Sequence, residues 1–363
     1  AEKINFKKKE RRPIMKVIKK ARKNKLNTFT EVEGYDHYLG LDYSQDGYSL
    51  GRVTARMKSP KYISGSSRVE EIQEQLSKLK GKKILTIEET TSTHWLYVEL
   101  KDYVDKIVVC DPYRNSLLSE GAKNDDIDAG KLSLLLRGGF LKEVYHSMEE
   151  SYEIRKLISA YEDLIKSGVR IKNQQSSLYR SLGLSYKKRE ELPDSSIVKF
   201  IERQQNRAIK TYNEEKERYL KYFEKLQREI PVIDNMCKIS GIETISSVKI
   251  YGTVIDAKRF ANKNKYWGYC GLVNHQKMSG NRNYGKRKTR YSRVLKSVYK
   301  TAALAAIRGN NDIREYYEYL LSKGLPAHKA RNAVSRYIAK VTYAMMKNNT
   351  EYIQYTWSKT EAA

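Results

Sequence analysis

The sequence has little of what disulfide-bonded, zinc-binding or membrane proteins are built from. Its 363 residues include only three cysteines, five histidines and six prolines. The cysteines (Cys110, Cys237 and Cys270) lie far apart and form no CxxC pair, which excludes a disulfide framework and a zinc knuckle. No apolar run approaches the length that spans a bilayer, so no membrane partner is expected. We therefore expect a protein of a reducing, cytoplasmic compartment.

Acidic residues are scarce relative to basic ones. Lysine and arginine number 70 against 43 aspartates and glutamates, which leaves a formal net charge of +27 at pH 7. An excess of this size predicts a polyanionic partner, most plausibly nucleic acid. The 29 tyrosines fit such a partner because their rings can stack on bases, although we expect most of them to pack in the core.

Twelve of the basic residues fall within the first 30 positions, against only Glu2 and Glu10. We interpret residues 1–33 as a flexible or partly helical basic arm that contacts phosphates. A solvated tail without a specific target is the alternative. The stretch has no apolar h-region, so we do not expect it to be a secretory signal.

Strand and helix signals alternate through residues 34–146. The expected elements are a hairpin, a helix, a strand, a helix, a strand and a helix, over residues 35–55, 68–80, 82–90, 93–104, 106–113 and 123–141. This order predicts an α/β domain with a mixed sheet.

Acidic side chains are expected to meet at one edge of that sheet. Asp42 lies in an apolar strand, where a buried carboxylate needs a partner, and Glu88 and Glu89 end a later strand. Asp125 and Asp128 are three residues apart, so both lie on one face of the first turn of a helix. Active groups gather at the carboxyl ends of strands and at neighbouring helix starts, so these acids can converge.

Ionised carboxylates that lie together repel one another unless a cation lies between or beside them. Hard oxygen ligands suit Mg²⁺ or Mn²⁺, so the functional interpretation is a two-metal phosphoryl-transfer site. The structural alternative is that Asp125 and Asp128 form an acidic first turn that complements the helix dipole, while Asp42 faces water at a strand end.

Residues 147–231 change to long, charged helical segments. Two apolar stripes, separated by a polar connector, predict an antiparallel helical hairpin or coiled coil. Ser195 or Ser196 is the expected cap of the second helix, and Pro231 is expected to end it. The segment is interpreted as a spacer or oligomerisation arm, with a local helical bundle as the alternative.

Residues 232–363 predict a mostly α-helical domain with a Gly-Ile turn at Gly241 and a basic loop. Between Lys277 and Lys300 there are nine basic residues and no acid. The residues expected to bind nucleic acid are Lys277, Arg282, Lys286, Arg287, Lys288, Arg290 and Arg293. Ser279 precedes a glycine in this flexible loop, where a hydroxyl among cations could attack phosphorus. The alternative is an ordinary turn serine.

In this order the blocks resemble the transposases of insertion sequence family 110, which include the Piv-type DNA invertases. The similarity extends from about residue 36 to residue 350, and the blocks that carry it are GLDYSQDGYSL, ILTIEETTSTHWLYVEL, VVCDPYRNSLLSEGAKNDDIDAGKLSLLL, ISGIETISSVKI and YWGYCGLVNHQKMSG. Thr91 and Ser92 stand where the family usually has glycine, so Glu89 remains the alternative to Glu88 as the second acid.

The resemblance implies a RuvC-like domain, a coiled coil and a C-terminal serine domain. It implies that Mg²⁺ or Mn²⁺ is held by an acidic tetrad, Asp42, Glu88, Asp125 and Asp128. It also implies that Ser279 attacks a DNA phosphorus and forms a phosphoserine link.

The implied partners are double-stranded donor and target DNA and a structured noncoding guide RNA, the bridge RNA, which would carry sequence choice by base pairing. A homo-oligomer is also implied, a dimer that becomes a tetramer in the synaptic complex, so that one subunit's serine meets another's tetrad. The expected location is the nucleoid of a prokaryotic cytoplasm.

Two other functions remain open from the sequence. A metal-dependent nuclease or Holliday-junction resolvase would use the acids and water without a covalent step, and the role of Ser279 discriminates between the two mechanisms. A non-catalytic nucleic-acid-binding scaffold would be indifferent to the loss of Asp125.

Overall fold

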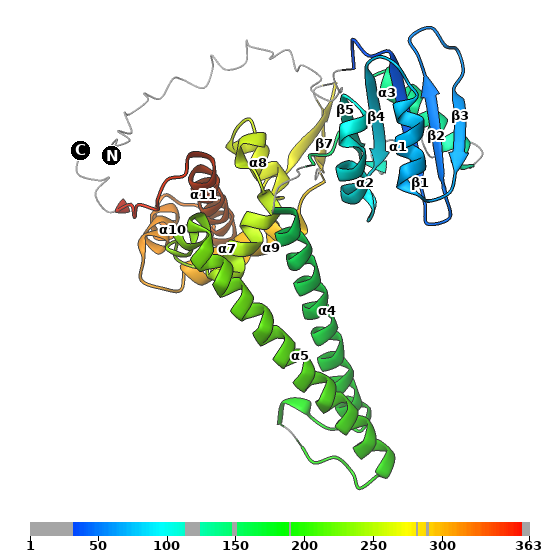
Figure 1. The fold of residues 1–363 in the computed structure, drawn as a ribbon. Coiled ribbons are helices and arrows are strands. Elements are labelled where there is room, and N and C mark those ends of the chain that lie inside the picture. Colours follow the sequence, from blue (N-terminus) through cyan, green and yellow to red (C-terminus); the bar gives the residue numbers. More distant parts are fainter. Residues whose placement is uncertain are drawn as a thin grey trace, which may run out of the picture. The chain divides into compact units, whose positions relative to one another are not determined.

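The chain divides into two compact units, residues 1–148 and 149–363 (Figure 1). The computed structural model describes residues 32–112, 124–146, 151–188, 190–280, 282–287 and 290–357. A mixed sheet flanked by helices forms the first unit and the second is mostly helical, which confirms these two parts of the predicted fold class. Almost all of the predicted basic arm lies outside the described residues.

A five-stranded mixed sheet, in the order β3-β2-β1-β4-β5, is the centre of the described part of the first unit. The strands are β1 (His37–Tyr43), β2 (Tyr48–Val53), β3 (Lys61–Gly65), β4 (Lys83–Glu88) and β5 (Lys106–Cys110). β2 pairs antiparallel with both β1 and β3, whereas β1, β4 and β5 run parallel. This arrangement is consistent with a RuvC-like domain. The sequence did not predict β3, because its mostly exposed residues carry no apolar alternation.

Helices cover both faces of this sheet. They are α1 (Val69–Ser77), α2 (Thr93–Leu100), which continues into a short 3-10 turn (Lys101–Tyr103), and α3 (Asp125–Arg137). Leu39 and Leu41 of β1 pack with α1 and α2, while Tyr38 packs on the opposite face with Leu132 and Leu136 of α3. Successive strand residues point to opposite faces, so β1 contributes to both cores.

Two facing glycines let α3 lie directly on the sheet. Gly40 of β1 pairs with Gly51 of β2, and a Cβ built on either would come within 2.5 Å of the backbone oxygen of Ala129. Any side chain there would push the helix away from the strands. The start of α3 is thereby held close to the end of β1.

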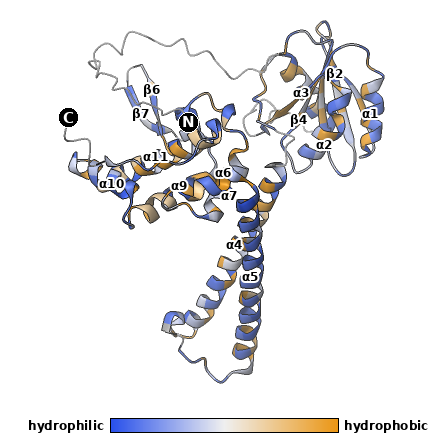
Figure 2. Ribbon diagram, turned by 60° about the vertical axis from the view of Figure 1, so that its left-hand side comes forward, coloured by the Kyte–Doolittle hydropathy of each residue, from blue (hydrophilic) through white to orange (hydrophobic). Residues whose placement is uncertain are grey.

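The second unit begins with two long helices, α4 (Ser151–Ser181) and α5 (Ser196–Glu229). Gln175 Nε2 donates a hydrogen bond to Asn206 Oδ1 at 2.6 Å, and Tyr179 Oη donates one to Glu202 at 2.9 Å. Residue numbers rise along one helix as they fall along the other, so the pair is antiparallel, as predicted. Hydrophilic residues dominate much of this hairpin (Figure 2). Coiled-coil packing stays a prediction.

The ends of α5 follow the local sequence signals. Ser195 Oγ accepts a hydrogen bond from the backbone N–H of Val198, so Ser195 is the cap and Ser196 the first helical residue. At the other end the helix stops at Glu229, and Pro231 begins the next helix, where a missing N–H does no harm.

The rest of the unit packs shorter helices around one core, with a small hairpin beside them. The helices are α6 (Pro231–Cys237), α7 (Thr244–Val254), α8 (Lys263–Tyr269), α9 (Arg293–Ala306), α10 (Asp312–Ser322) and α11 (Ala327–Asn348). A 3-10 turn (Ala257–Arg259) lies between α7 and α8 in the chain. The hairpin consists of strands β6 (His275–Ser279) and β7 (Arg282–Arg287). Buried hydroxyls of Tyr266, Tyr299 and Thr342 form a hydrogen-bonded chain in this core. None of the helices in the described part of the chain is long and apolar enough to cross a membrane.

The predicted Gly-Ile turn connects α6 to α7. Gly241 adopts a φ of +85°, and a Cβ there would lie 2.3 Å from the backbone oxygen of Ala302. Glycine is required at this position for both reasons, because its φ is positive and because the turn touches α9.

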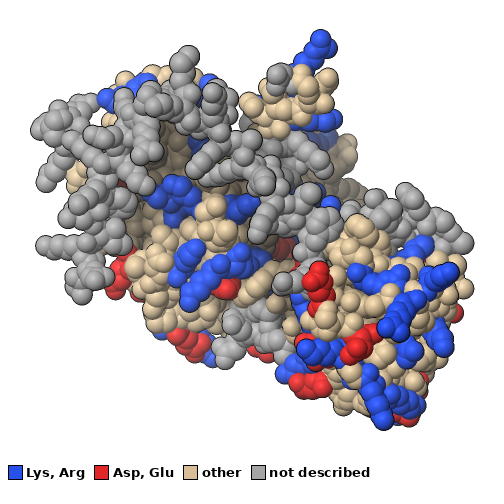
Figure 3. All heavy atoms as spheres, turned by 90° about the horizontal axis from the view of Figure 1, so that it is seen from above, with Lys and Arg blue, Asp and Glu red and all other residues tan. Residues whose placement is uncertain are grey.

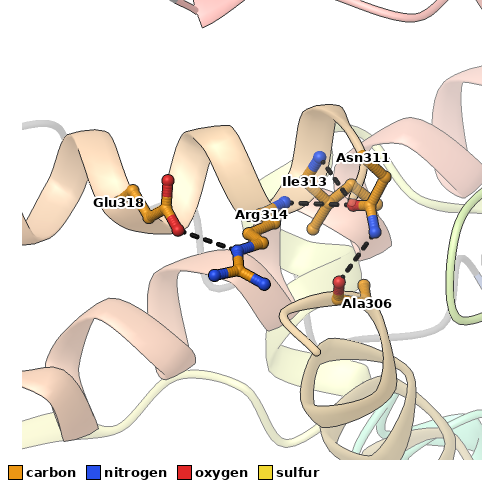
Figure 4. Close-up of polar contacts among 5 residues, drawn as sticks. All are labelled: Ala306, Asn311, Ile313, Arg314 and Glu318. Atoms are coloured by element: carbon orange, nitrogen blue, oxygen red, sulfur yellow. Dashed lines mark hydrogen bonds and ion pairs between the residues drawn. The ribbon is translucent and has the colours of Figure 1, made fainter. Parts of the chain in front are cut away.

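One asparagine joins the end of α9 to the start of α10 (Figure 4). Asn311 Oδ1 accepts hydrogen bonds from the backbone N–H groups of Ile313 at 3.1 Å and Arg314 at 3.0 Å. Its Nδ2 donates to the carbonyl of Ala306 at 2.8 Å. The side chain thus satisfies free groups of two helix ends at once.

We expect Asn311→Ala to destabilise the second unit by about 1–2 kcal/mol, the usual effect of removing an N-cap. Thermal unfolding followed by circular dichroism measures this as a lower Tm. Asn310→Ala, at the exposed neighbouring position, is the matched control and should leave the Tm unchanged. Equal Tm values for the two variants would show that the cap has no structural role.

Candidate functional site

The four predicted acids lie around the carboxyl ends of two parallel strands and the start of a helix. We call these residues the acid cluster: Asp42, Glu88, Asp125 and Asp128. Asp42 is near the end of β1, and Glu88 is the last residue of the neighbouring β4. Leu41 pairs with Ile87 in the parallel ladder, so Asp42 and Glu88 follow at adjacent positions. Asp125 and Asp128 occupy the first turn of α3.

Electrostatic interactions link the members of the acid cluster. Burial raises the pKa of Asp42, and the negative charges of Asp125 and Asp128 raise it further. Burial is also the main cause of the raised pKa of Glu88, to which the charges of Asp42 and Asp128 add. The structure therefore brings the acids close enough for their charges to disfavour the ionised forms of Asp42 and Glu88.

The donor types and the crowding of charge in the acid cluster fit a hard divalent cation. Carboxylate oxygens are the ligands that Mg²⁺ and Mn²⁺ prefer, and a cation would relieve the repulsion. The side chains are nevertheless not drawn together as a coordination shell, since no three His, Cys, Asp or Glu residues within the described ranges could hold a metal ion as they stand. Lys131 Nζ forms an ion pair with Asp128 at 3.3 Å, and its positive charge balances part of the negative charge of the acid cluster.

Ser279 lies in the second unit, at the tip of the β6–β7 hairpin. It is the last residue of β6, it is exposed, and it pairs across the turn with Arg282. Gly280 in the turn has a φ of +52°. The prediction of a flexible loop was wrong at this point, because a Gly-Asn pair between two short extended runs is a hairpin signal.

Several of the predicted nucleic-acid-binding residues are exposed. Those described as exposed are Lys277, Arg282, Lys286, Arg290 and Arg293. The side chain of Arg287 and the whole of Lys288 lie outside the described residues. Figure 3 shows lysine and arginine side chains spread widely over the visible face, with acidic ones among them. Binding of nucleic acid by these particular residues stays a prediction.

Two family models match the chain on these parts of the structure. One, described as "Transposase IS116/IS110/IS902 family", matches residues 234–318, which include the β6–β7 hairpin. The other, a DEDD transposase model of IS110 elements, matches residues 44–182. The chain belongs to the IS110 family of transposases. It is therefore a DNA-processing enzyme of an insertion sequence. No curated protein matches the chain.

In this transposase the two candidate glutamates differ in surroundings. Burial, and then the charges of Asp42 and Asp128, raise the pKa of Glu88, whereas Glu89 is exposed and its backbone N–H donates to the carbonyl of Cys110 at 2.9 Å. Thr93 Oγ1 donates to the carbonyl of Glu88 at 2.8 Å and accepts from the N–H of Thr90 at 2.6 Å, which shapes the turn after β4. This geometry favours Glu88.

The sequence analysis missed Asp126, which lies between the two aspartates of the acid cluster. Its Oδ1 accepts hydrogen bonds from Ser49 Oγ of β2 at 2.5 Å and from Ser64 Oγ of β3 at 2.7 Å. These hydroxyls lower the pKa of Asp126, so it holds a negative charge beside the two serines. The carboxylate ties the first turn of α3 to β2 and β3. Three of the four residues from Asp125 to Asp128 are aspartates, and the sequence does not indicate which of them binds the two serines.

A buried thiol and a buried acid lie at the end of the neighbouring strand β5 and just after it, beside Glu88. Cys110 is paired with Glu88 in the β4–β5 ladder, and burial is the main reason that its pKa rises to about 12. The thiol is therefore neutral and unreactive at physiological pH. Asp111, the next residue, is only 2% exposed. It lies at the edge of the sheet that carries Asp42 and Glu88.

We expect Asp126→Asn to destabilise the first unit, because its hydrogen bonds to a charged acceptor become weaker, by about 1–2 kcal/mol. The lowered pKa of Asp126 means that its contribution is present above its ordinary pKa and is lost as the pH falls through the lowered value. The variant should therefore lose less stability than the wild type on acidification.

Urea unfolding at several pH values measures both effects of Asp126→Asn. Ser49→Ala combined with Ser64→Ala should reproduce them, since it removes the donors. Asp46→Asn, in the exposed hairpin turn, is the control that should change neither the stability nor its pH dependence. An Asp126→Asn protein as stable as the control would contradict the anchoring role.

Proposed function

We propose that this transposase cuts and rejoins DNA through a phosphoserine intermediate, using an acid cluster that binds Mg²⁺ or Mn²⁺. The crowding of four carboxylates at one edge of the sheet carries the proposal. Burial and the neighbouring carboxylates raise the pKa of Asp42 and of Glu88, so their charged forms are unfavourable in the folded protein without a counterion. A cluster of this kind on a family of DNA-processing enzymes is accounted for by a bound divalent cation.

The four residues of the acid cluster would hold the cation. When bound, it would supply positive charge beside a phosphate oxygen on which negative charge develops. Lys131 contributes a second, fixed positive charge through its ion pair with Asp128. Asp126 and the glycine contacts of α3 keep the first turn of the helix in place without coordinating anything themselves.

Ser279 is proposed as the nucleophile. Its hydroxyl is exposed, and the sequence places the cationic side chains of Lys277 and Arg282 on either side of it, suited to hold a phosphate. In the cutting step the hydroxyl loses its proton and its oxygen forms a bond to phosphorus. One ester P–O bond breaks, and the leaving oxygen takes up a proton. The phosphoserine ester conserves the bond for rejoining by the reverse step.

The proposed partners are duplex donor and target DNA, a structured guide RNA and further copies of the chain. The net charge of +27 supports polyanionic partners. Exposed apolar side chains near the start of α5, Ile197 at 70% and Phe200 at 56% exposure, support the α4–α5 hairpin as an oligomerisation arm. The guide RNA rests on the family resemblance.

We expect Mg²⁺ or Mn²⁺ to stabilise the first unit more at neutral than at acidic pH. The ordinary pKa values of Asp42 and Glu88 are 3.8 and 4.5, and both are raised in the folded protein. The folded state thus binds more protons than the unfolded chain in that window, so stability without metal falls as the pH rises through it. Metal at a hundred times its Kd would restore about 2.7 kcal/mol.

Thermal shift measurements with each metal across pH 4 to 8 test this, with Ca²⁺ for comparison. Glu88→Gln should abolish the metal-induced shift, and Glu89→Gln is the matched control that should retain it. If Glu89→Gln alone abolishes the shift, the assignment of the second acid is wrong. If no metal raises the Tm of the wild type at any pH, the acid cluster is not a metal site.

We expect Ser279→Ala to abolish both strand exchange and the protein–DNA adduct, while leaving the metal-induced thermal shift intact. The adduct is measured as a slower band on denaturing gels after incubation with labelled DNA. Ser297→Ala, an exposed serine of α9, is the control and should behave as the wild type. Strand cleavage that persists in Ser279→Ala without an adduct would indicate a nuclease that uses water instead.

A further inference from the structure

Cationic side chains from three helices of the second unit lie together, and none of them belongs to the β6–β7 hairpin. We call them the cation surface: Lys263 of α8, Lys296 and Lys300 of α9, and Arg331, Arg336 and Lys340 of α11. Residues four apart lie on one face of a helix, which applies to both the α9 pair and Arg336 with Lys340. None of these residues was among those predicted to bind nucleic acid.

Packing of the helices holds these cations beside one another. Lys300 Nζ donates a hydrogen bond to Asn332 Oδ1, which joins the basic face of α9 to α11. Trp267 Nε1 donates to the carbonyl of Arg336 at 2.9 Å and joins α8 to α11. Lys263 Nζ lies 5.7 Å from the centre of the Trp267 ring. The cation surface therefore crosses the seam between helices that share one core.

The crowding of these charges is unfavourable for the fold. Burial lowers the pKa of Lys300, and the charges of Lys296, Arg336 and Arg331 lower it further. Burial and the charge of Lys263 do the same for Lys340. The like charges around these two lysines disfavour their charged forms. An anion bound across the surface would reverse that balance.

We propose that the cation surface binds the phosphate backbone of duplex DNA. This inference rests on the proposed function, because it identifies where the DNA processed by the transposase is held. The half-buried lysines are fixed by packing and are spaced along two helices, which suits a row of phosphates better than a single small anion. Contacts of this kind carry no sequence information, in keeping with choice of sequence by another partner.

The test is the salt dependence of binding to a DNA duplex of random sequence, measured by fluorescence anisotropy. Lys300→Gln combined with Lys340→Gln removes two charges, and glutamine keeps a donor for Asn332. We expect binding to weaken about tenfold for each lysine near 0.1 M salt. The slope of log K against log salt should fall by about 1 for each lysine. The Tm should not fall, because the lost charges were destabilising.

Arg308→Gln combined with Lys323→Gln is the matched control, since both residues are exposed cations of the same unit outside the cation surface. The control should keep the wild-type slope. If both double variants lose the same affinity for duplex DNA, the DNA is attracted by the overall positive charge of the protein and not by the cation surface. Affinity and Tm that fall together would show a structural role. A loss of binding to duplex RNA with none to DNA would overturn the choice of ligand.

The outcome can be separated from that of the proposed function. Asp125→Asn should bind duplex DNA with the wild-type slope while it lacks strand exchange, because binding at the cation surface needs no chemistry. If that variant binds normally and the lysine double variant does not, the cation surface stands even where the serine mechanism fails. If the lysine double variant binds DNA as the wild type does, the surface is overturned and the serine mechanism is untouched.

Discussion

The close approach of α3 to the sheet is the constraint on which the first unit depends. Gly40 and Gly51 leave no side chain between the helix backbone and strands β1 and β2, and Asp126 accepts hydrogen bonds from Ser49 of β2 and Ser64 of β3. Because the α3 backbone contacts the strands directly, the first turn of α3 lies beside the ends of β1 and β4. Four carboxylates are thereby crowded together, and burial disfavours the charged forms of two of them, Asp42 and Glu88. The fold thus stabilises a charge arrangement that is unfavourable in itself.

The two units crowd charges of opposite sign by the same physical means. In the first, half-burial and neighbouring acids raise the pKa of Asp42 and Glu88. In the second, half-burial and neighbouring cations lower the pKa of Lys300 and Lys340. In each case the packed core supplies the stability that the like charges reduce. Groups held in this way are suited to a ligand of opposite charge, a cation in one unit and a polyanion in the other.

Much of the fold was predictable because burial leaves a regular trace in the sequence. Apolar residues at helical or strand spacing correctly predicted the hairpin, α1, β4, β5 and the long antiparallel helices. Elements with little buried surface leave no such trace. β3 is largely exposed, and so are the described side chains of the β6–β7 hairpin, so neither was predicted. Their formation depends on pairing with other strands.

The sequence by itself determined the charge excess, the order of the elements, the family resemblance and the spacing of Asp125 and Asp128. It could not decide between Glu88 and Glu89, nor single out Asp126, because neighbouring residues of one type look alike in a string. Only the tertiary structure separates these residues by their surroundings, since strand pairing and helix packing determine which carboxylate meets other acids and which meets serine hydroxyls. The choice of Glu88 as the second acid of the site stays a prediction. The cation surface was likewise hidden, because its members come from three helices and gather only when those helices share a core.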